Sequence, residues 1–317
     1  MGKVWVVGSS NIDMIFNVPC LPSCGETVLA SALAIAPGGK GFNQAVAAHR
    51  SGAQVVFVGC VGNDAYASLV TSALEEEGIQ ADALKNHPAV PTGMAIVYVD
   101  TVGRNTIVVS PGANMALTAE EAQERLSGIE AGDWVLSQLE LPPDTVRQVF
   151  KFCKMRGVNT VLNYSPVVEA ARDIISLTDL LIVNEVEAQW LSGLLPDSFR
   201  TGGDAARLLS RLGPEIVVIT LGALGSVVYR PDQIIEVCAL KVDAVDTQGA
   251  GDAFTGVLVG LLAQGHPLDD ALDVANWAAG QTVCRPGSTR LSMPSKREIS
   301  DCAARFVFRR EDRGEMR

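Results

Sequence analysis

The sequence lacks the features of a membrane protein or a nucleic-acid-binding protein. Within its 317 residues, no apolar run reaches the roughly 18 residues that a membrane-spanning helix needs. Basic residues number 25 against 36 acidic ones, and the net charge of -11 argues against nucleic acid or an anionic membrane as the main partner. Because Lys3 is followed at once by a strand-like run, we also expect no signal peptide.

Cysteine and histidine are too few and too scattered to indicate a zinc centre. The chain has seven cysteines and three histidines. Cys20 and Cys24 are close in sequence, but no second Cys/His pair completes a metal site. An odd number of scattered cysteines is typical of reduced thiols, so we expect a cytoplasmic protein.

Two common phosphate-binding signatures are also missing. No Gly-x4-Gly-Lys-Ser/Thr loop occurs, and the dinucleotide fingerprint would need a glycine where Phe254 stands. A phosphate site in this chain must therefore be of another type.

The most informative segment that is present is Asp-Thr-Gln-Gly-Ala-Gly-Asp-Ala-Phe-Thr-Gly at 246–256. It runs from a predicted strand at 240–245 into a helix that begins near Ala250. Gly249 and Gly251 leave backbone amides bare at the positive end of this helix, where an anion can bind. Asp252 would stand beside that anion as a general base, taking a proton from a hydroxyl that attacks a phosphoryl group. The alternative is that Asp252 is only a favourable charge at the helix dipole.

Polar residues near the N-terminus could bind a sugar. Gly39 permits close backbone approach, while Lys40 and Asn43 bring a cation and a planar amide. Asn11 and Asp13 alternate along an extended chain, so they project to one face, where they could hold a vicinal diol. The alternatives are a solvated lysine at a helix start and a polar strand end.

Strand-like and helical runs alternate along most of the chain. This alternation predicts an α/β fold with a mostly parallel sheet sandwiched by helices, with ligands bound beyond the carboxyl ends of the strands. The predicted strands are 4–7, 55–58, 134–137, 160–162, 180–183 and 216–220. The predicted helices include 64–77, 119–127, 144–155, 185–191 and 204–212. The stretches 12–37 and 92–110 lack helical periodicity.

These motifs, in this order, resemble the ribokinase family of carbohydrate kinases. The signatures are Gly-Gly-Lys-Gly-Phe-Asn-Gln-Ala at 38–45 and the segment at 246–254, and the resemblance extends from about Val4 to Ile299. It implies an α/β nucleotide-binding and catalytic core at 1–11, 38–91 and 111–317. It also implies a small β-sheet lid at 12–37 and 92–110, which would form a homodimer contact.

The resemblance further implies an ATP- and Mg²⁺-dependent phosphotransferase. Asp252 would be the general base, in contact with the acceptor hydroxyl, and the amides of Gly249, Ala250 and Gly251 would form the anion hole. The implied sugar-binding residues are Asn11, Asp13, Gly39, Lys40, Asn43 and Glu140. The implied nucleotide-binding residues are Asn184, Glu187, Thr220, Gly222, Gly225 and Asn276, with Glu187 near Mg²⁺ through water. The implied positions around a monovalent cation, K⁺, are Asp246, Gln248, Thr282, Arg285, Gly287 and Ser292.

The implied reaction is transfer of the γ-phosphate of ATP to D-ribose, giving ribose 5-phosphate. Another small sugar such as fructose, or a nucleoside, is the alternative acceptor, and a sugar or nucleotide sensor without turnover is the alternative outside enzymes. Three departures from the family pattern bear on these expectations, and one of them is Asn-Tyr-Ser-Pro at 163–166, where the family typically carries Asn-Pro-Ala-Pro. Phe42 replaces a small residue, which we expect to pack rather than to narrow the pocket, and the segment 287–292 is one residue longer than usual.

Overall fold

A large, mostly parallel β-sheet forms the centre of the molecule. The computed structural model describes residues 2–194, 202–231 and 233–312. The strands of this sheet are β1 (Val4–Val7), β4 (Val55–Gly62), β5 (Leu84–His87), β8 (Trp134–Ser137), β9 (Asn159–Asn163), β10 (Leu180–Asn184), β11 (Ile216–Thr220), β12 (Ser226–Arg230) and β13 (Gln233–Val237). Their order is β13-β12-β11-β10-β9-β8-β1-β4-β5. Only β12 and β13 pair antiparallel with their neighbours.

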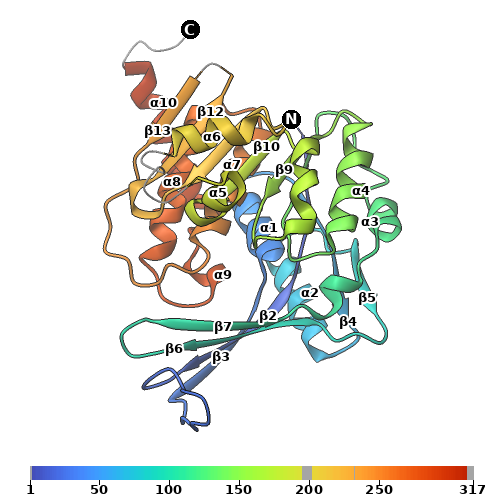
Figure 1. Cartoon of the computed structure of the whole chain (residues 1–317), viewed down its shortest axis with the longest axis vertical. Coiled ribbons are helices and arrows are strands. Elements are labelled where there is room, and N and C mark those ends of the chain that lie inside the picture. Colours follow the sequence, from blue (N-terminus) through green and yellow to red (C-terminus); the bar gives the residue numbers. More distant parts are fainter. Residues whose placement is uncertain (1, 195–201, 232, 313–317) are drawn as a thin grey trace.

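Helices cover both faces of this sheet (Figure 1). Successive residues of β1 show why: Val4 and Val6 pack into one hydrophobic layer, and Trp5 and Val7 into the other. The first layer contains α1 (Lys40–Arg50), α2 (Ala65–Glu77), α7 (Ala250–Ala263), α8 (Leu268–Val283) and α10 (Lys296–Asp312). The second contains α3 (Ala119–Arg125), α4 (Pro143–Lys154), α5 (Glu185–Ser192) and α6 (Gly203–Ser210). Short helical turns are η1 (Gly112–Ala116), η2 (Glu169–Leu177), η4 (Gly222–Leu224) and α9 (Thr289–Ser292).

A second, smaller sheet projects from one end of the core (Figure 1). Its strands are β2 (Asn11–Asn17), β3 (Ala32–Gly38), β6 (Gly93–Val99) and β7 (Asn105–Ser110), in the order β3-β2-β6-β7. Ala95 and Val97 of β6 are buried, whereas Ile107 and Val109 of β7 are about half exposed. The predicted fold, a mostly parallel sheet between helices with a small β-sheet lid, is therefore confirmed.

One predicted element is wrong, and three strands of the large sheet were not predicted. The segment 240–245 is not a strand: it leaves the sheet after β13 and runs beside α8, where Leu240 lies over Gly280. Its end is held by the amides of Val245 and Asp246, which both donate to the carbonyl of Val283. An apolar segment such as 240–245 becomes a β-strand only when a neighbouring strand supplies backbone hydrogen bonds. Strands β5, β12 and β13 carry too mixed a pattern for the sequence to single them out.

Among the helices in the described part of the chain, none combines the length and the apolar character needed to cross a bilayer.

Candidate active site

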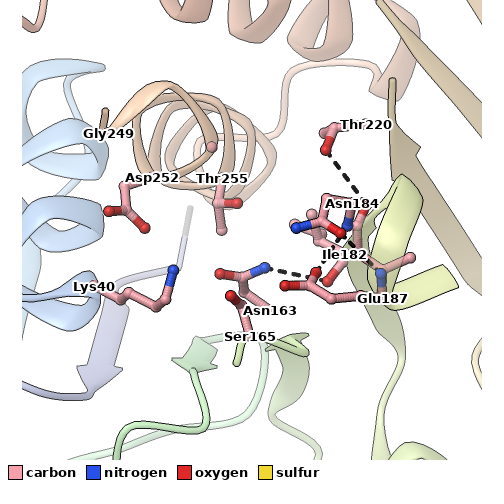
Figure 2. Close-up of a pocket in the computed structure, with 12 residues that line it drawn as sticks. Lys40, Asn163, Ser165, Ile182, Asn184, Glu187, Thr220, Gly249, Asp252 and Thr255 are labelled. Carbon is pink, nitrogen blue, oxygen red and sulfur yellow. Dashed lines mark hydrogen bonds between the residues drawn. The ribbon is translucent and has the colours of Figure 1, made fainter. Parts of the chain in front are cut away.

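Two adjoining cavities lie where the carboxyl ends of β10 and β11 face the start of α7. The first, of about 120 Å³, is polar and is lined by Lys40, Asn163, Asn184, Glu187, Thr220 and Asp252, among others. Figure 2 shows Lys40 and Asp252 on one side of it and Asn184, Glu187 and Thr220 on the other. The second, of about 470 Å³, is mostly apolar and is lined by residues that include Leu240, Val242, Phe254, Ala279 and Val283. Thr220 and Gly251 line both cavities, so the two cavities lie side by side.

The turn that starts α7 exposes backbone amides to both cavities. Gly249 is the N-cap residue with φ 71°, a left-handed conformation that favours glycine. A methyl group at Gly249 would also overlap the side chain of Thr289. A Cβ at Gly251 would meet no atom within 4 Å among the described residues outside its own helical turn, and Gly251 lines both cavities. Because neither glycine has a side chain, an anion can approach the amides of this turn closely.

Asp252 lies in the first turn of α7 and is 8% exposed. Its Oδ2 accepts a hydrogen bond from Asn43 Nδ2 at 3.1 Å, and its Oδ1 accepts one from Gln44 Nε2 at 2.9 Å. Burial raises the pKa of Asp252, while the charge of Lys40 and these two hydrogen bonds oppose the rise. The carboxylate is thus fixed in position and more basic than an exposed aspartate, as a general base requires.

A network of amide side chains, which the sequence analysis missed, holds Asp252 in place. Gln44 Nε2 also donates to Asn163 Oδ1 at 2.9 Å, and Gln44 Oε1 accepts from Gln138 Nε2 at 2.5 Å. Gln44 lies in the glycine-rich signature at 38–45, and Asn163 ends β9 directly after the predicted strand 160–162. Both positions therefore carried a signal in the sequence. Nothing in the sequence indicated that Gln138 would meet them.

Asn11 and Asp13 lie on the same face of β2, as predicted. Asn11 is fixed by Asn114, whose Nδ2 donates to Asn11 Oδ1 at 2.8 Å. Burial, followed by the charges of Glu140 and Asp252, raises the pKa of Asp13 to about 7. Carboxylates from β2, from the loop after β8 and from α7 therefore face the same small region.

Glu140 and Lys40, from the α/β core, border the region that Asp13 and Asp252 face. Glu140 Oε2 accepts from Ser9 Oγ at 2.5 Å and from the Lys40 amide at 3.2 Å. Burial alone would lower the pKa of Lys40, but nearby carboxylates, Asp252 first, outweigh it and raise the pKa.

Gly39 has φ 92°, and a Cβ there would lie 2.9 Å from the Asn11 amide nitrogen. Asn43 Oδ1 is buried and accepts no hydrogen bond from the described residues, so it is available to a ligand hydroxyl.

Asn184 and Glu187 lie on the opposite wall, at the junction of β10 and α5. They form a capping box: Asn184 Oδ1 accepts from the Glu187 amide at 2.9 Å, and Glu187 Oε2 accepts from the Asn184 amide at 2.8 Å. Burial raises the pKa of Glu187. Thr220 ends β11 beside them, with its hydroxyl 3.4 Å from the Val183 carbonyl oxygen.

Gly222, Gly225 and Asn276 lie around the apolar cavity. Gly222 and Gly225 have φ values of 56° and 102° in the turn after β11. Asn276 projects from α8 and donates to Ser226 Oγ at 3.1 Å. Unpredicted residues from 239–244 form another wall, because this segment runs along α8 instead of forming a strand.

The six candidate cation positions come from three neighbouring segments. The loop at 246–248 is tied to the end of α8 through the Val283 carbonyl, and Gln248 donates its amide to Asp246 Oδ1 at 2.9 Å. Side chains of Thr282 and Ser292 are engaged locally, and Arg285 pairs with Glu298 at 2.5 Å. The remaining position is Gly287, with φ 119°. Contacts to a cation at these positions would therefore come largely from backbone carbonyls.

Phe42 does not line either cavity. It is fully buried in the hydrophobic layer that contains α1 and α7. The expectation that Phe42 packs and does not narrow the pocket is therefore confirmed.

Comparisons with known proteins agree with this architecture. The family model described as pfkB family carbohydrate kinase matches residues 1–296. A protein named ribokinase from Haemophilus influenzae is 35% identical over 293 residues, covering 92% of this chain and 95% of its own length. A protein named deoxyribokinase from Salmonella typhi is 32% identical over 297 residues, covering 93% and 97%. The solved structure of Arabidopsis thaliana ribokinase complexed with ribose and ATP is similar with a TM-score of 0.86 and 30% identity, covering 96% of this chain and 99% of that one.

Proposed function

Because this chain belongs to the pfkB family of carbohydrate kinases, we propose that it transfers the γ-phosphate of ATP to the terminal hydroxyl of D-ribose, giving ribose 5-phosphate. The observation that carries the proposal is the placement of Asp252. Its buried carboxylate lies in the first turn of α7, beside the bare amides of that turn and facing the polar cavity. Relatives named ribokinase, and the ribokinase structure with ribose and ATP, support ribose as the acceptor.

In this mechanism the sugar lies between β2 and the core. Asn11 and Asp13 would form hydrogen bonds with its hydroxyl groups from one side, and Gly39, Lys40, Asn43 and Glu140 would close the other. Asp252 would accept the proton of the attacking hydroxyl, because its raised pKa makes it a stronger base than an exposed aspartate. The amides of Gly249, Ala250 and Gly251 would stabilise the charge that develops on the transferring phosphoryl group.

The nucleotide would occupy the second cavity. Its apolar walls suit a purine ring, with Asn276 at the ring or ribose and Gly222 and Gly225 allowing close approach. Thr220 lines both cavities, and Asn184 and Glu187 line the polar one beside it, so the three would face the phosphates. When bound, Mg²⁺ would offset phosphate charge, and the buried carboxylate of Glu187 suits contact with it through water.

We also propose a K⁺ site beside the anion-hole turn. It would be formed by Asp246, Gln248, Thr282, Arg285, Gly287 and Ser292, largely through carbonyl oxygens, which suit an alkali cation. Activity measured in KCl and in NaCl at equal ionic strength would test the site. Equal rates in the two salts would exclude it.

We propose that 12–37 and 92–110 act as one lid and that two lids meet in a homodimer. Exposed apolar side chains on its edge strands support this: Leu33 and Ile35 of β3 and Ile107, Val108 and Val109 of β7 are each about half exposed. Analytical ultracentrifugation of the parent and of Val108→Asp tests the contact. A parent protein that stays monomeric at micromolar concentration would exclude it.

The seven cysteines, all within the described residues, form no disulfide. This supports the proposal that the protein works in the reducing cytoplasm. Fractionation of cells that express the tagged protein would test that location.

The proposed reaction is tested by ADP release from MgATP with ribose, 2-deoxyribose, fructose and nucleosides. We expect the highest kcat/KM with ribose, and NMR of the product should place the phosphate on O5. A preference for 2-deoxyribose would keep the mechanism and change the acceptor, an outcome that the similarity to a deoxyribokinase makes worth measuring. No release with any acceptor, while ATP still binds, would favour a sensor without turnover.

A further inference from the structure

Charged side chains fasten the short helix α9 to the ends of α1 and α2, and the most exposed of them, Glu76, accepts from Arg290 Nη2 at 2.8 Å. Glu77, the last residue of α2, accepts hydrogen bonds from Arg50 at 2.6 and 2.9 Å and from Arg290 Nε at 2.7 Å. We call Arg50, Glu77 and Arg290 the α9 clamp. Their side chains are only 15%, 11% and 21% exposed, so these ion pairs are less screened than surface pairs.

The clamp also holds the backbone of α9. Arg50 Nη1 donates to the carbonyl oxygens of Arg290 at 3.0 Å and of Met293 at 3.1 Å. One guanidinium thus binds both the carboxylate and the main chain that carries Arg290. Burial would raise the pKa of Glu77, but the hydrogen bonds from the two arginines outweigh it and lower the pKa. Glu77 therefore remains charged and paired across the neutral pH range.

The other end of α9 lies against the turn that starts α7. The side chain of Thr289 packs directly on the Cα of Gly249, leaving no room for a methyl group there. Within α9, the Met293 amide and the Ser292 hydroxyl both donate to the Thr289 carbonyl at 3.1 Å. Arg290 directly follows Thr289 in this short hydrogen-bonded turn, so the clamp holds the chain one residue away from the contact with Gly249.

We propose that the α9 clamp is a positioning device for phosphoryl transfer: by fixing α9, it holds Thr289 against Gly249 and keeps the anion-hole amides in place. The proposal rests on the proposed function of that turn. Arg50, Glu77 and Arg290 line a separate surface cavity, and none of them lines the two cavities of the active site. They are positioning residues that act through Thr289, and a shift of about 1 Å in catalytic groups can cost up to about a hundredfold in rate.

The test compares Arg290→Ala and Glu77→Gln with a matched control, Arg147→Ala. Arg147 is 20% exposed and also pairs with two carboxylates, Asp144 and Asp173, but it lies on α4 in the opposite helical layer. We expect both clamp variants to lower kcat by about tenfold or more, with the KM values for sugar and ATP within about threefold of the parent. The control should stay within about twofold in kcat, and because its carboxylate partners are 73% and 61% exposed, it should lose less thermal stability than the clamp variants.

Two further readouts separate positioning from general loosening. The double variant Arg290→Ala/Glu77→Gln should lose little more kcat than the worse single variant, because the residues act as one unit. Hydrogen exchange of the 245–252 amides should be roughly tenfold faster in the clamp variants and unchanged in the control.

Clamp variants whose kcat matches that of Arg147→Ala, or whose 245–252 amides exchange at the parent rate, would overturn the proposal. The exchange measurement needs no substrate. If the parent showed no kinase activity, the proposed function would fail, and exchange alone would still decide whether the clamp orders the turn.

Discussion

Replacing Asp252 by asparagine is the sharpest test of the proposed chemistry, because it removes one negative charge and almost no volume. The carboxylate of Asp252 accepts one hydrogen bond at each oxygen, from Asn43 and from Gln44. An asparagine offers one oxygen and one NH2 group, so one of these donors would face another donor. The loss of a buried hydrogen bond costs about 1–3 kcal/mol.

Two features of the site reduce that cost. Asn43 Oδ1 is buried and has no donor among the described residues, so a flip of the Asn43 amide would let it accept from the new NH2 group. Asparagine is uncharged, so the variant also avoids the free-energy cost of burying a carboxylate, which is the cost that raises the pKa of Asp252. We therefore expect Asp252→Asn to fold with a thermal midpoint within a few degrees of the parent.

Turnover should respond much more strongly than stability. A general base contributes about 10²–10⁴-fold to the rate, which corresponds to roughly 3–5 kcal/mol of barrier. We expect kcat in coupled ADP release to fall by that factor, with the sugar KM within about threefold of the parent. Turnover within threefold of the parent would refute the assignment of Asp252 as the base.

A matched control addresses the alternative that Asp252 only complements the helix dipole. Asp204 also lies in the first turn of a helix, α6, but it is exposed and outside both cavities. Asp204→Asn should leave kcat within about twofold of the parent. Equal losses of kcat in the two variants would indicate a general effect of removing a first-turn carboxylate and would argue against proton transfer by Asp252.

Three further changes test neighbouring parts of the site. The pKa of Asp13 is about 7 in the folded protein, against an ordinary value of 3.8. Its favourable contribution to the free energy of unfolding is therefore complete below pH 3.8 and is lost as pH rises through 7. Asp13→Asn should accordingly raise the unfolding midpoint at pH 8 far more than at pH 4. The same variant should raise the sugar KM by about 10-fold or more, since hydrogen bonds to a charged group contribute about 1.5–3 kcal/mol, and an unchanged KM would remove Asp13 from the sugar site. Gly249→Ala should lose at least about tenfold in kcat and about 1–2 kcal/mol of unfolding free energy, because alanine disfavours φ 71° and its methyl group meets Thr289; a parent-like enzyme would contradict this account of the turn. Gln44→Leu removes a donor from the Asp252 carboxylate, which raises the pKa of that group further and should move the acidic limb of the pH–kcat/KM profile to higher pH; loss of stability without a shift of the limb would indicate packing alone.

Much of the architecture could be predicted because it depends on local patterns. Helix α2 begins where Asp64 caps it and ends before Gly78 in the left-handed conformation, and both residues are visible in the sequence. The apolar runs that became β1, β4, β8, β9, β10 and β11 are typical of strands buried on both faces. The alternation of Asn11 and Asp13 and the two glycines before Asp252 are short-range patterns of the same kind.

Long-range contacts could not be predicted, because they join residues whose local sequence carries no sign of their partner. The strand expected at 240–245 depends on a neighbouring strand, and only the tertiary structure shows that the sheet ends at β13. Gln138 meets Gln44 across 94 positions, and Arg290 meets Glu77 across 213.

The sequence by itself determined the α/β class, most of the elements in their order and the candidate residues for the proposed chemistry, since periodicity, helix caps and glycine turns act within a few residues. The tertiary structure decided which polar groups are buried together, and therefore which carboxylates have raised pKa values. It also decided which loop walls the apolar cavity and what holds α9 against the turn of α7. These depend on burial and on distances between distant segments, which exist only once the chain is folded.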